Sequence, residues 1–116
     1  MGDNETIFDK IIRREIPATI VFENDRILAF NDINPQAPVH ILIIPKRRIV
    51  DLAKTEFSDA QTLGELLVVA GEVARSLKLD GGGFRTVINS GAEAGQSVFH
   101  LHVHLLAGRP FRWPPG

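Results

Sequence analysis

The sequence predicts an α+β fold in which a mainly antiparallel five-stranded sheet is combined with one long and one short helix. The first observation is the order of the predicted elements, which runs helix, strands, helix, strands. The second is that most connections between predicted strands have hairpin length, which favours antiparallel pairing. The third is the size of the chain, because 116 residues, of which 44% are hydrophobic and 23% charged, suit one domain, residues 1–116.

The first predicted element is a short helix within residues 6–17. Thr6 can cap its first turn, and Asp9 stands three residues later, as in a capping box. Pro17 stops the helix because proline lacks the backbone N–H that a helix needs. The apolar residues of this helix share one face: Ile7, Phe8, Ile11 and Ile12.

Three strands are predicted between the two helices. Residues 18–24 and 26–32 are rich in β-branched and aromatic residues, and the Asn24-Asp25 pair between them is a hairpin signal. Residues 39–45 form an apolar run typical of a buried strand. The proline-rich stretch before this strand, residues 34–38, is a turn.

The strongest helical signal covers residues 58–79. Ser58 and Gln61 fit a capping box at its start. Val68 and Val69 lie off the apolar stripe, which leaves a second face for burial, for instance against a partner chain. The stripe itself follows the helical period: Leu63, Leu66, Leu67, Ala70, Val73, Ala74 and Leu77.

Two more strands and a loop complete the chain. Gly81–Gly83 end the long helix, residues 84–90 form a strand, and residues 91–97 form a glycine-rich loop. The last strand covers residues 98–107. The proline-rich tail that follows cannot be a helix or a central strand, but it can lie extended against another subunit.

Composition excludes several classes of protein. The net charge is -1 and the longest basic run is Lys46-Arg47-Arg48, so we expect no binding to long nucleic acid or to a membrane surface. The chain has no cysteine, which excludes disulfides, thiolate metal sites and a cysteine nucleophile. Its N-terminal residues are acidic where a signal peptide is basic, and no apolar stretch approaches the ~20 residues of a membrane span. We therefore expect a soluble protein of the cytoplasm, with the nucleus as a second location.

Three of the four histidines alternate along the last predicted strand, at His100, His102 and His104. Side chains of a strand alternate between its two faces, so these imidazoles point to one side. Residues two apart on one face lie about 6.5–7 Å from each other, which lets imidazoles surround one small group. The other side of the strand faces the core and carries Phe99, Leu101, Val103 and Leu105.

Three interpretations of the alternating histidines compete. An accident on a solvated strand face accounts for them poorly, because three of only four histidines alternate strictly. A zinc site accounts for them better, with two histidines at i and i+2 and His40 completing the ligand set. Phosphoryl transfer is the third: a neutral imidazole attacks phosphorus while other groups fix its tautomer, neutralise charge and supply a proton. The histidines alone do not separate the last two.

The loop before the histidines favours phosphoryl transfer. Gly91 and Gly95 allow the backbone to approach a ligand closely, and amide groups of such a loop can form an anion-binding nest. Gln96 and Ser97 add side-chain donors. A phosphate site needs these features and a metal site does not, although a simple hairpin loop is also rich in glycine.

Four segments together resemble the histidine triad superfamily, in particular its Hint branch. They are residues 6–18, residues 30–46, the motif GQSVFHLHVHLL at residues 95–106 and the ending WPPG, and they occur in the order expected of that branch. The resemblance implies a homodimer whose sheets join across the two-fold axis. It also implies hydrolysis of purine nucleoside 5′-phosphoramidates and of aminoacyl adenylates through a nucleotidyl-histidine intermediate, with no metal and no cofactor.

The resemblance also implies roles for individual residues. His102 matches the nucleophile, His104 matches a phosphate contact, and Ser97 matches the hydroxyl near the leaving amine. His100 and His40 match histidines that orient the site. The other nucleotide contacts are Asn89, Gly95 and Gln96 beside the phosphate, Asp32 at the ribose, and Ile7, Phe8, Ile11, Phe30 and Ile33 around the base.

Several of these residues also suit a purely structural role. Asp32 precedes a turn, where aspartate is common, and the apolar slot residues would serve equally well in a core. Trp113 matches a residue that reaches the partner's site, and it could equally pack on the surface. Asn31 departs from relatives that carry histidine beside the ribose aspartate, which leaves the substrate preference open.

The sequence leaves three alternatives to this function. The first is hydrolysis of dinucleoside polyphosphates by the same triad, and the second is a metalloprotein. The third is a non-catalytic protein that binds nucleotide or a protein partner through its dimer surface. The intact loop and triad argue against pure scaffolding.

Overall fold

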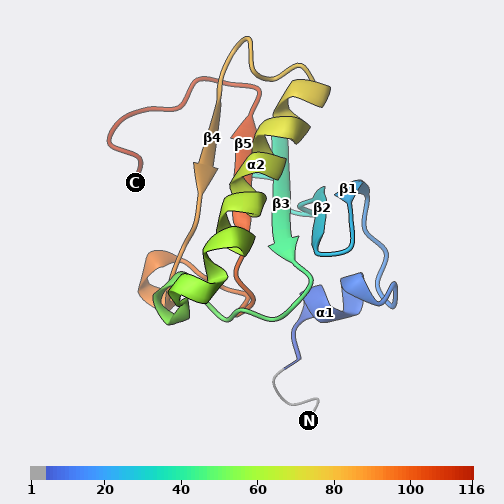
Figure 1. The fold of residues 1–116 in the computed structure, drawn as a ribbon. Coiled ribbons are helices and arrows are strands. Elements are labelled where there is room, and N and C mark those ends of the chain that lie inside the picture. The colour runs from blue at the N-terminus through green and yellow to red at the C-terminus, as the bar shows by residue number, and fades with distance from the viewer. Residues whose placement is uncertain (1–4) are drawn as a thin grey trace.

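The computed structural model describes residues 5–116, which form a five-stranded sheet and two α-helices (Figure 1). The sheet order is β1-β2-β3-β5-β4, and all neighbouring strands are antiparallel. The predicted α+β class is therefore confirmed. The acidic start of the chain, residues 1–4, lies outside the described residues. The bounds are α1 Ile7–Ile12, β1 Ile20–Glu23, β2 Ile27–Asn31, β3 Val39–Pro45, α2 Ala60–Ser76, β4 Phe84–Val87 and β5 Val103–Ala107.

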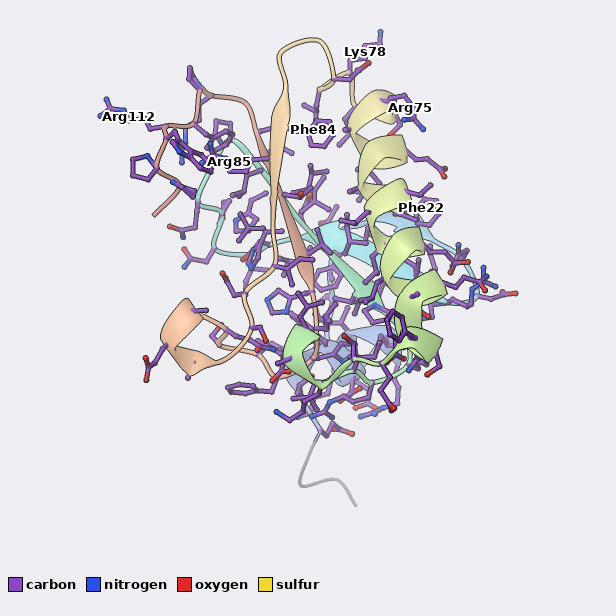
Figure 2. The ribbon with its side chains drawn as sticks, turned by 60° about the vertical axis from the view of Figure 1, so that its left-hand side comes forward. Phe22, Arg75, Lys78, Phe84, Arg85 and Arg112 are labelled. Atoms are coloured by element: carbon purple, nitrogen blue, oxygen red, sulfur yellow. The ribbon has the colours of Figure 1, made fainter. Side chains whose placement is uncertain are left out.

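The sheet carries an apolar core on each face. On one face α2 covers the central strands, where Leu66 and Val73 share a core with Ile43 of β3. Phe22 of β1 packs against the same core, beside α2 (Figure 2). Because side chains of a strand alternate, the central strand β3 is buried on both faces. The opposite face packs against α1, with a core of Phe8, Ile11, Leu28, Phe30, Leu42 and Ile44.

Helix α1 begins where predicted but ends sooner. The side chains of Thr6 and Asp9 accept the backbone N–H groups expected of the predicted capping box, which is confirmed. The helix ends at Ile12 instead of continuing to Pro17. The reason is local, since Arg14 takes a positive φ of 63° and so turns the chain out of the helical path.

The start of α2 differs from the prediction. The predicted capping box of Ser58 and Gln61 is wrong, and Glu56 and Asp59 form one instead. The physical reason is a short 3-10 helix, Phe57–Asp59, which precedes α2 and moves the cap upstream. Neither this helix nor any other within residues 5–116 is long and apolar enough to cross a membrane.

The buried face of α2 is narrower than the predicted stripe. Val69, expected off the stripe, is 4% exposed, whereas Leu67 and Leu77 of the stripe are 49% and 45% exposed. The sheet buries only the positions at i, i+3, i+4, i+7 and i+8, which form one side of a helix. These are Leu66, Val69, Ala70, Val73 and Ala74.

The two last strands are shorter than predicted. Strand β4 ends at Val87 instead of residue 90, and β5 begins at Val103 instead of residue 98. The backbone before β5 bonds to a loop and not to a strand, because the N–H of Leu101 donates to the carbonyl of Ile49 at 2.6 Å. Phe99 is 42% exposed, so the prediction that its side chain enters the core is wrong.

Candidate functional site

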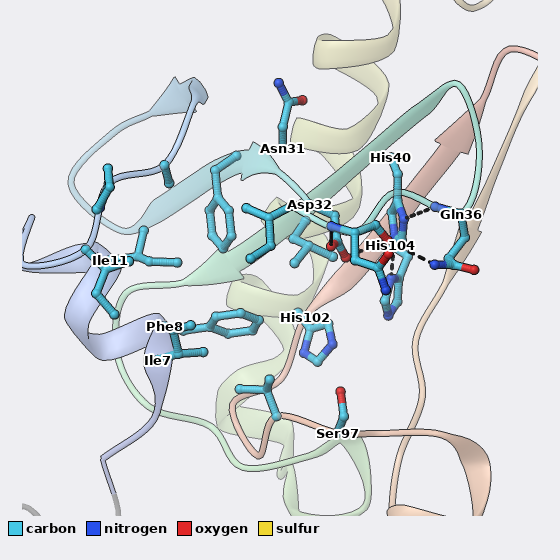
Figure 3. A pocket seen from close by; sticks show the side chains of 18 residues that line it. Ile7, Phe8, Ile11, Asn31, Asp32, Gln36, His40, Ser97, His102 and His104 are labelled. Carbon is cyan, nitrogen blue, oxygen red and sulfur yellow. Dashed lines mark hydrogen bonds and ion pairs between the residues drawn. The ribbon is translucent and has the colours of Figure 1, made fainter.

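A cavity of about 380 Å³ opens between α1, the turn after β2 and the segment that leads into β5 (Figure 3). One end is apolar and is lined by residues of α1, and the other end is polar and holds His40 and His104. His102 and Ser97 lie between the two ends (Figure 3). A cavity with an apolar end and a few convergent polar groups has the size and character of a small-molecule site.

The cavity brings most of the predicted site residues together. Those that line it are Ile7, Phe8, Ile11, Phe30, Asp32, Ile33, His40, Ser97, His102 and His104. Those that do not line it are Asn89, Gly95, Gln96 and His100.

The apolar end is organised around Phe8. Its ring meets the ring of Phe30 edge-on, with centroids 5.6 Å apart, and the ring of His102 at 5.1 Å and an angle of 90°. Phe8 is buried because α1 lies directly over the sheet, whereas Ile33 at the rim is 88% exposed. The apolar end is therefore a slot with one free apolar wall, which a bound flat group would cover.

A chain of hydrogen bonds fixes the tautomers of two imidazoles. The backbone N–H of Gln36 donates to Nδ1 of His40 at 3.0 Å, so this nitrogen is an acceptor. The proton of a neutral His40 is then on Nε2, which lies 2.9 Å from Nδ1 of His104 and donates to it. His104 must in turn carry its proton on Nε2. The polar end of the cavity thus contains an imidazole N–H that is available to an anion.

His102 has the opposite tautomer. Its Nδ1 lies 2.7 Å from the carbonyl oxygen of His100 and must donate its proton, because a carbonyl can only accept. Nε2 of the neutral ring therefore carries a lone pair. The ring centroids of His102 and His104 are 4.9 Å apart, so the ring with the bare nitrogen, His102, lies next to the ring with the free N–H, His104.

The environment keeps these imidazoles neutral. Burial lowers the pKa of His102 below its ordinary value of 6.5, against the opposing effects of its bond to the His100 carbonyl and of Asp32. Burial, with His102 and His40 nearby, lowers the pKa of His104 to about 4. Burial also lowers the pKa of His40, although the charge of Asp32 opposes that shift. At neutral pH these rings are uncharged, as the tautomer chain requires.

Asp32 serves both the turn and the site. Its Oδ1 accepts the backbone N–H of Asn34 at 2.8 Å, which is the turn-forming role that its position suggested. Its Oδ2 lies 3.5 Å from Nε2 of His40 and faces the cavity region. The turn contact of Asp32 therefore leaves its second carboxylate oxygen beside His40. Asn31 also lines the cavity next to it.

The loop before the histidines is held by its own side chains. The amide oxygen of Gln96 accepts the N–H of Gly91 at 2.8 Å, and the amide nitrogen donates to the carbonyls of Val50 and Val98 at 2.8 and 3.1 Å. Gly95 has a φ of 101°, a conformation that favours glycine. Gln96 thus shapes the loop that presents Ser97, and its side-chain donors point into the loop and not into the cavity.

Gln36 is a site residue that the sequence analysis missed. It lines the cavity, and its backbone N–H begins the hydrogen-bond chain through His40. No side-chain chemistry could have pointed to it, because every residue except proline has this N–H. The only signal was that Gln36 lies in the predicted turn, residues 34–38, four residues before His40.

Asp32, His40 and His104 offer donor atoms that all lie within 4.8 Å of one another, which is a candidate cation site. The ligand types suit zinc. The fit is incomplete, because Nε2 of His40 and Nδ1 of His104 already share a hydrogen bond of 2.9 Å. A metal ion bound by these atoms would have to break this bond, so the residues present do not form a ready-made metal site.

Fold and site define a class of small α+β protein with an imidazole pair at one end of a ligand slot. The chain belongs to the HIT domain family, whose model matches residues 13–111. It is 55% identical over 118 residues to the 14 kDa zinc-binding protein of Zea mays, covering 100% of this chain and 91% of that protein.

Two further relatives are informative. The chain is 55% identical over 117 residues to adenylylsulfatase HINT1 of Arabidopsis thaliana, covering 99% of this chain and 79% of that protein. A HIT family hydrolase from Legionella pneumophila has a crystal structure that covers 95% of this chain and 98% of its own, with 47% identity and a TM-score of 0.92. The predicted histidine triad family and its Hint branch are thus confirmed, and the family places this chain among hydrolases.

Proposed function

We propose that this protein hydrolyses purine nucleoside 5′-phosphoramidates, as an adenosine 5′-monophosphoramidase, through a nucleotidyl-histidine intermediate. The observation that carries the proposal is the complementary pair of imidazoles in the cavity. His102 keeps a bare Nε2, and His104 offers an Nε2–H. A nucleophile beside an anion donor is what a two-step phosphoryl transfer requires.

The substrate lies along the cavity. Its base occupies the apolar slot formed by Ile7, Phe8, Ile11, Phe30 and Ile33, and its ribose hydroxyls reach Asp32. The phosphoryl group sits at the polar end, where Nε2–H of His104 donates to a non-bridging oxygen. The orientation is supported by the two ends of the cavity, because apolar side chains gather at one end and Asp32, His40 and His104 at the other, with His102 and Ser97 between them (Figure 3).

In the first step Nε2 of His102 attacks phosphorus and the P–N bond to the amine breaks. The amine takes a proton through the hydroxyl of Ser97, which is exposed to the cavity and to solvent. His102 keeps its Nδ1–H, and the carbonyl of His100 stabilises the positive charge that develops on the ring. In the second step water attacks phosphorus and the P–N bond to His102 breaks. The proton that the water loses passes to solvent, and the nucleoside monophosphate leaves with a neutral imidazole restored.

The remaining predicted residues act indirectly in this proposal. His100 is fully buried and supplies the carbonyl that orients His102. Gly95 and Gln96 act in the loop that presents Ser97, where their backbone N–H groups bond to the carbonyls of Ala92 and Gly91. Asn89 stays a predicted phosphate contact that does not line the cavity. His40 sets the tautomer of His104.

We propose that the active protein is a homodimer of single-domain chains, residues 1–116, with the two sheets joined across the two-fold axis. The C-terminal tail supports a role at such an interface. It is held to the body of the protein by Phe111, whose ring lies under the guanidinium groups of Arg109 at 4.4 Å and Arg85 at 5.4 Å. Figure 2 shows Arg85 and Arg112 on this side of the molecule. Trp113 is 82% exposed, so it is free to reach the partner's site.

A second substrate class has support from a relative. The Arabidopsis relative is described as an adenylylsulfatase, and adenylyl sulfate also carries a leaving group on the phosphorus of an adenosine monophosphate. Aminoacyl adenylates and dinucleoside polyphosphates share the same adenylyl unit. The leaving group therefore distinguishes the candidates, and the base slot does not.

The experiment is a side-by-side assay with an adenosine phosphoramidate, adenylyl sulfate and a dinucleoside polyphosphate, all in the presence of a chelator. We expect the phosphoramidate to have the highest kcat/KM and the intact enzyme to show an adenylyl adduct by mass spectrometry. His102→Asn should lose at least about 10³-fold in kcat and the adduct, while AMP still binds. Near-normal turnover by His102→Asn would exclude the covalent mechanism. A wild-type protein that binds AMP without turnover would instead be a nucleotide-binding protein.

A further inference from the structure

His100 is the one histidine of the triad that does not line the cavity, and it is fully buried. Its Nε2 lies 2.7 Å from the carbonyl of Pro45 and donates to it. Its Nδ1 has no hydrogen-bond partner within residues 5–116, although Oδ1 of Asp9 in α1 lies 3.8 Å away. Because Nε2 carries the proton, Nδ1 of the neutral ring is an acceptor, so it forms no hydrogen bond with the carboxylate of Asp9 and any link between the two residues must run through another group.

The carboxylate of Asp9 is also joined to the backbone of the triad. Its Oδ2 accepts a hydrogen bond from Nη1 of Arg48 at 3.2 Å. Nε of the same guanidinium donates to the carbonyl of Phe99 at 3.2 Å. Phe99 is the residue before His100. Arg48 thus bridges α1 to the backbone of the triad, and the charge of Asp9 holds the guanidinium in place.

This network ends at the proposed nucleophile. The carbonyl of His100 accepts the Nδ1–H of His102 at 2.7 Å, and that bond decides which nitrogen of His102 is bare. Phe8, one residue before Asp9, contacts the rings of both His100 and His102, with centroids at 5.8 and 5.1 Å. A shift of His100 therefore moves the hydrogen-bond acceptor of His102.

We propose that Asp9 is a positioning residue for His102, acting through Arg48 and the backbone of Phe99 and His100. Its role in the capping box of α1 does not explain this arrangement. The cap uses only the bond from the Thr6 N–H to Oδ2 at 2.9 Å, and needs neither the guanidinium nor the imidazole. The kinetic part of this inference rests on the proposed function, and the positioning of the ring does not.

The chain offers variants that separate positioning from capping. Asp9→Asn keeps the size of the side chain and an oxygen for the Thr6 N–H, but it removes the charge that holds Arg48. Arg48→Lys keeps a positive charge but loses the fork that joins Asp9 to the Phe99 carbonyl. Thr6→Ala is the matched control, because it removes the other half of the capping box and leaves Asp9 and Arg48 paired.

The measurements are kcat for an adenosine phosphoramidate, Kd for AMP, Tm, and the imidazole ¹⁵N signals of His102. Asp9→Asn and Arg48→Lys should each lower kcat about tenfold, because a small misplacement of a nucleophile is costly, and leave Kd within about twofold. In both variants the ¹⁵N signals of His102 should move from the single Nδ1–H tautomer toward a mixture. Thr6→Ala should lower Tm while keeping kcat and the His102 signals of the wild type.

Equal changes of kcat in Asp9→Asn and Thr6→Ala would reduce Asp9 to a cap and overturn the proposal. An Asp9→Asn protein whose His102 signals match those of the wild type would overturn it as well. If the wild-type protein does not turn over the phosphoramidate, the proposed function fails. In that case the ¹⁵N signals of His102 in Asp9→Asn and Arg48→Lys still test whether Asp9 positions the ring, because they need no turnover.

Discussion

Nε2 of His40 lies 2.9 Å from Nδ1 of His104, and this contact determines what His104 presents to the cavity. His40 can donate here only because its other nitrogen accepts the backbone N–H of Gln36. A turn outside the triad thereby sets the tautomer of an imidazole that faces the ligand. The hydrogen bonding of the triad therefore depends on a residue that no triad motif includes.

The first prediction tests this chain at Gln36. Gln36→Pro removes the N–H that His40 accepts, so the tautomer of His40 and with it that of His104 is no longer fixed. We expect kcat/KM for an adenosine phosphoramidate to fall about 10- to 100-fold, since a donor to the phosphoryl oxygen is lost for part of the time.

The control at this position is Gln36→Ala, which keeps the backbone N–H and should keep most of the activity. Thermal unfolding of both variants checks that the turn still forms. Equal loss of activity in the two variants, with equal Tm, would mean that the side chain of Gln36 acts and that the tautomer chain does not.

The second prediction concerns the pH dependence of turnover. Burial lowers the pKa of His102, so its Nε2 is unprotonated and nucleophilic throughout the neutral range. Turnover should be constant from pH 8 down to pH 6.5, which is the ordinary pKa of a histidine. It should fall only at more acidic pH, when His102 gains a proton. The pH profile of kcat/KM between pH 4 and 8 measures this dependence. An acid limb centred above pH 6.5, or a rate that rises toward acid pH, contradicts a neutral His102 as nucleophile.

The third prediction concerns stability and has the same origin. Burial lowers the pKa of all four histidines in the folded protein, that of His104 to about 4, whereas in the unfolded chain they titrate near 6.5. Between these values the unfolded state binds more protons than the native state, so the free energy of unfolding rises with pH. We expect the urea midpoint to fall as the pH is lowered from 7 to 4.5.

The control for this stability effect is His104→Gln, which removes one of the titrating groups. The pH dependence of its urea midpoint should be shallower than that of the wild type. A wild-type midpoint that is constant over this range would show that the histidines are not held neutral in the fold.

The sequence analysis placed the alternating histidines on the correct side of the sheet because side-chain alternation is a property of extended backbone, and it continues where the strand ladder stops. Leu101 precedes β5, yet it points into the α2 core together with Val103 and Leu105, which leaves His102 and His104 on the other side. The pattern therefore predicted the correct face although the strand begins later than expected.

The burial and orientation of individual side chains could not be predicted, because they depend on segments distant in the chain. His100 is buried by the carbonyl of Pro45 and by Phe8 of α1, neither of which the local pattern contains. Gln96 was expected to point at a phosphate, but the carbonyls of Val50 and Val98 take its donors. Tautomers, which decide the chemistry here, follow from three-dimensional hydrogen bonding and not from residue type.

The fourth prediction addresses metal ions. Zinc should inhibit turnover, because it would bind Asp32, His40 and His104 at the cost of the His40–His104 hydrogen bond, and so occupy the carboxylate that is proposed to hold the ribose. We expect inhibition that excess nucleotide relieves, full activity in a chelator, and little effect of magnesium, which prefers oxygen ligands. Activity that a chelator abolishes and zinc restores would establish a metalloenzyme.

The last prediction tests the apolar end of the cavity without disturbing the fold. Ile33 lines the cavity but is 88% exposed, so its side chain contributes little to the core and a bound base would cover it. Ile33→Ala should weaken AMP binding about five- to tenfold, as expected when a ligand buries less apolar surface, and leave kcat and Tm unchanged. Phe57→Ala is the matched control, because Phe57 is equally apolar, 99% exposed and not part of the cavity lining. Calorimetric titration of both variants with AMP measures the difference, and an Ile33→Ala protein with the affinity of the Phe57→Ala protein would place the base elsewhere.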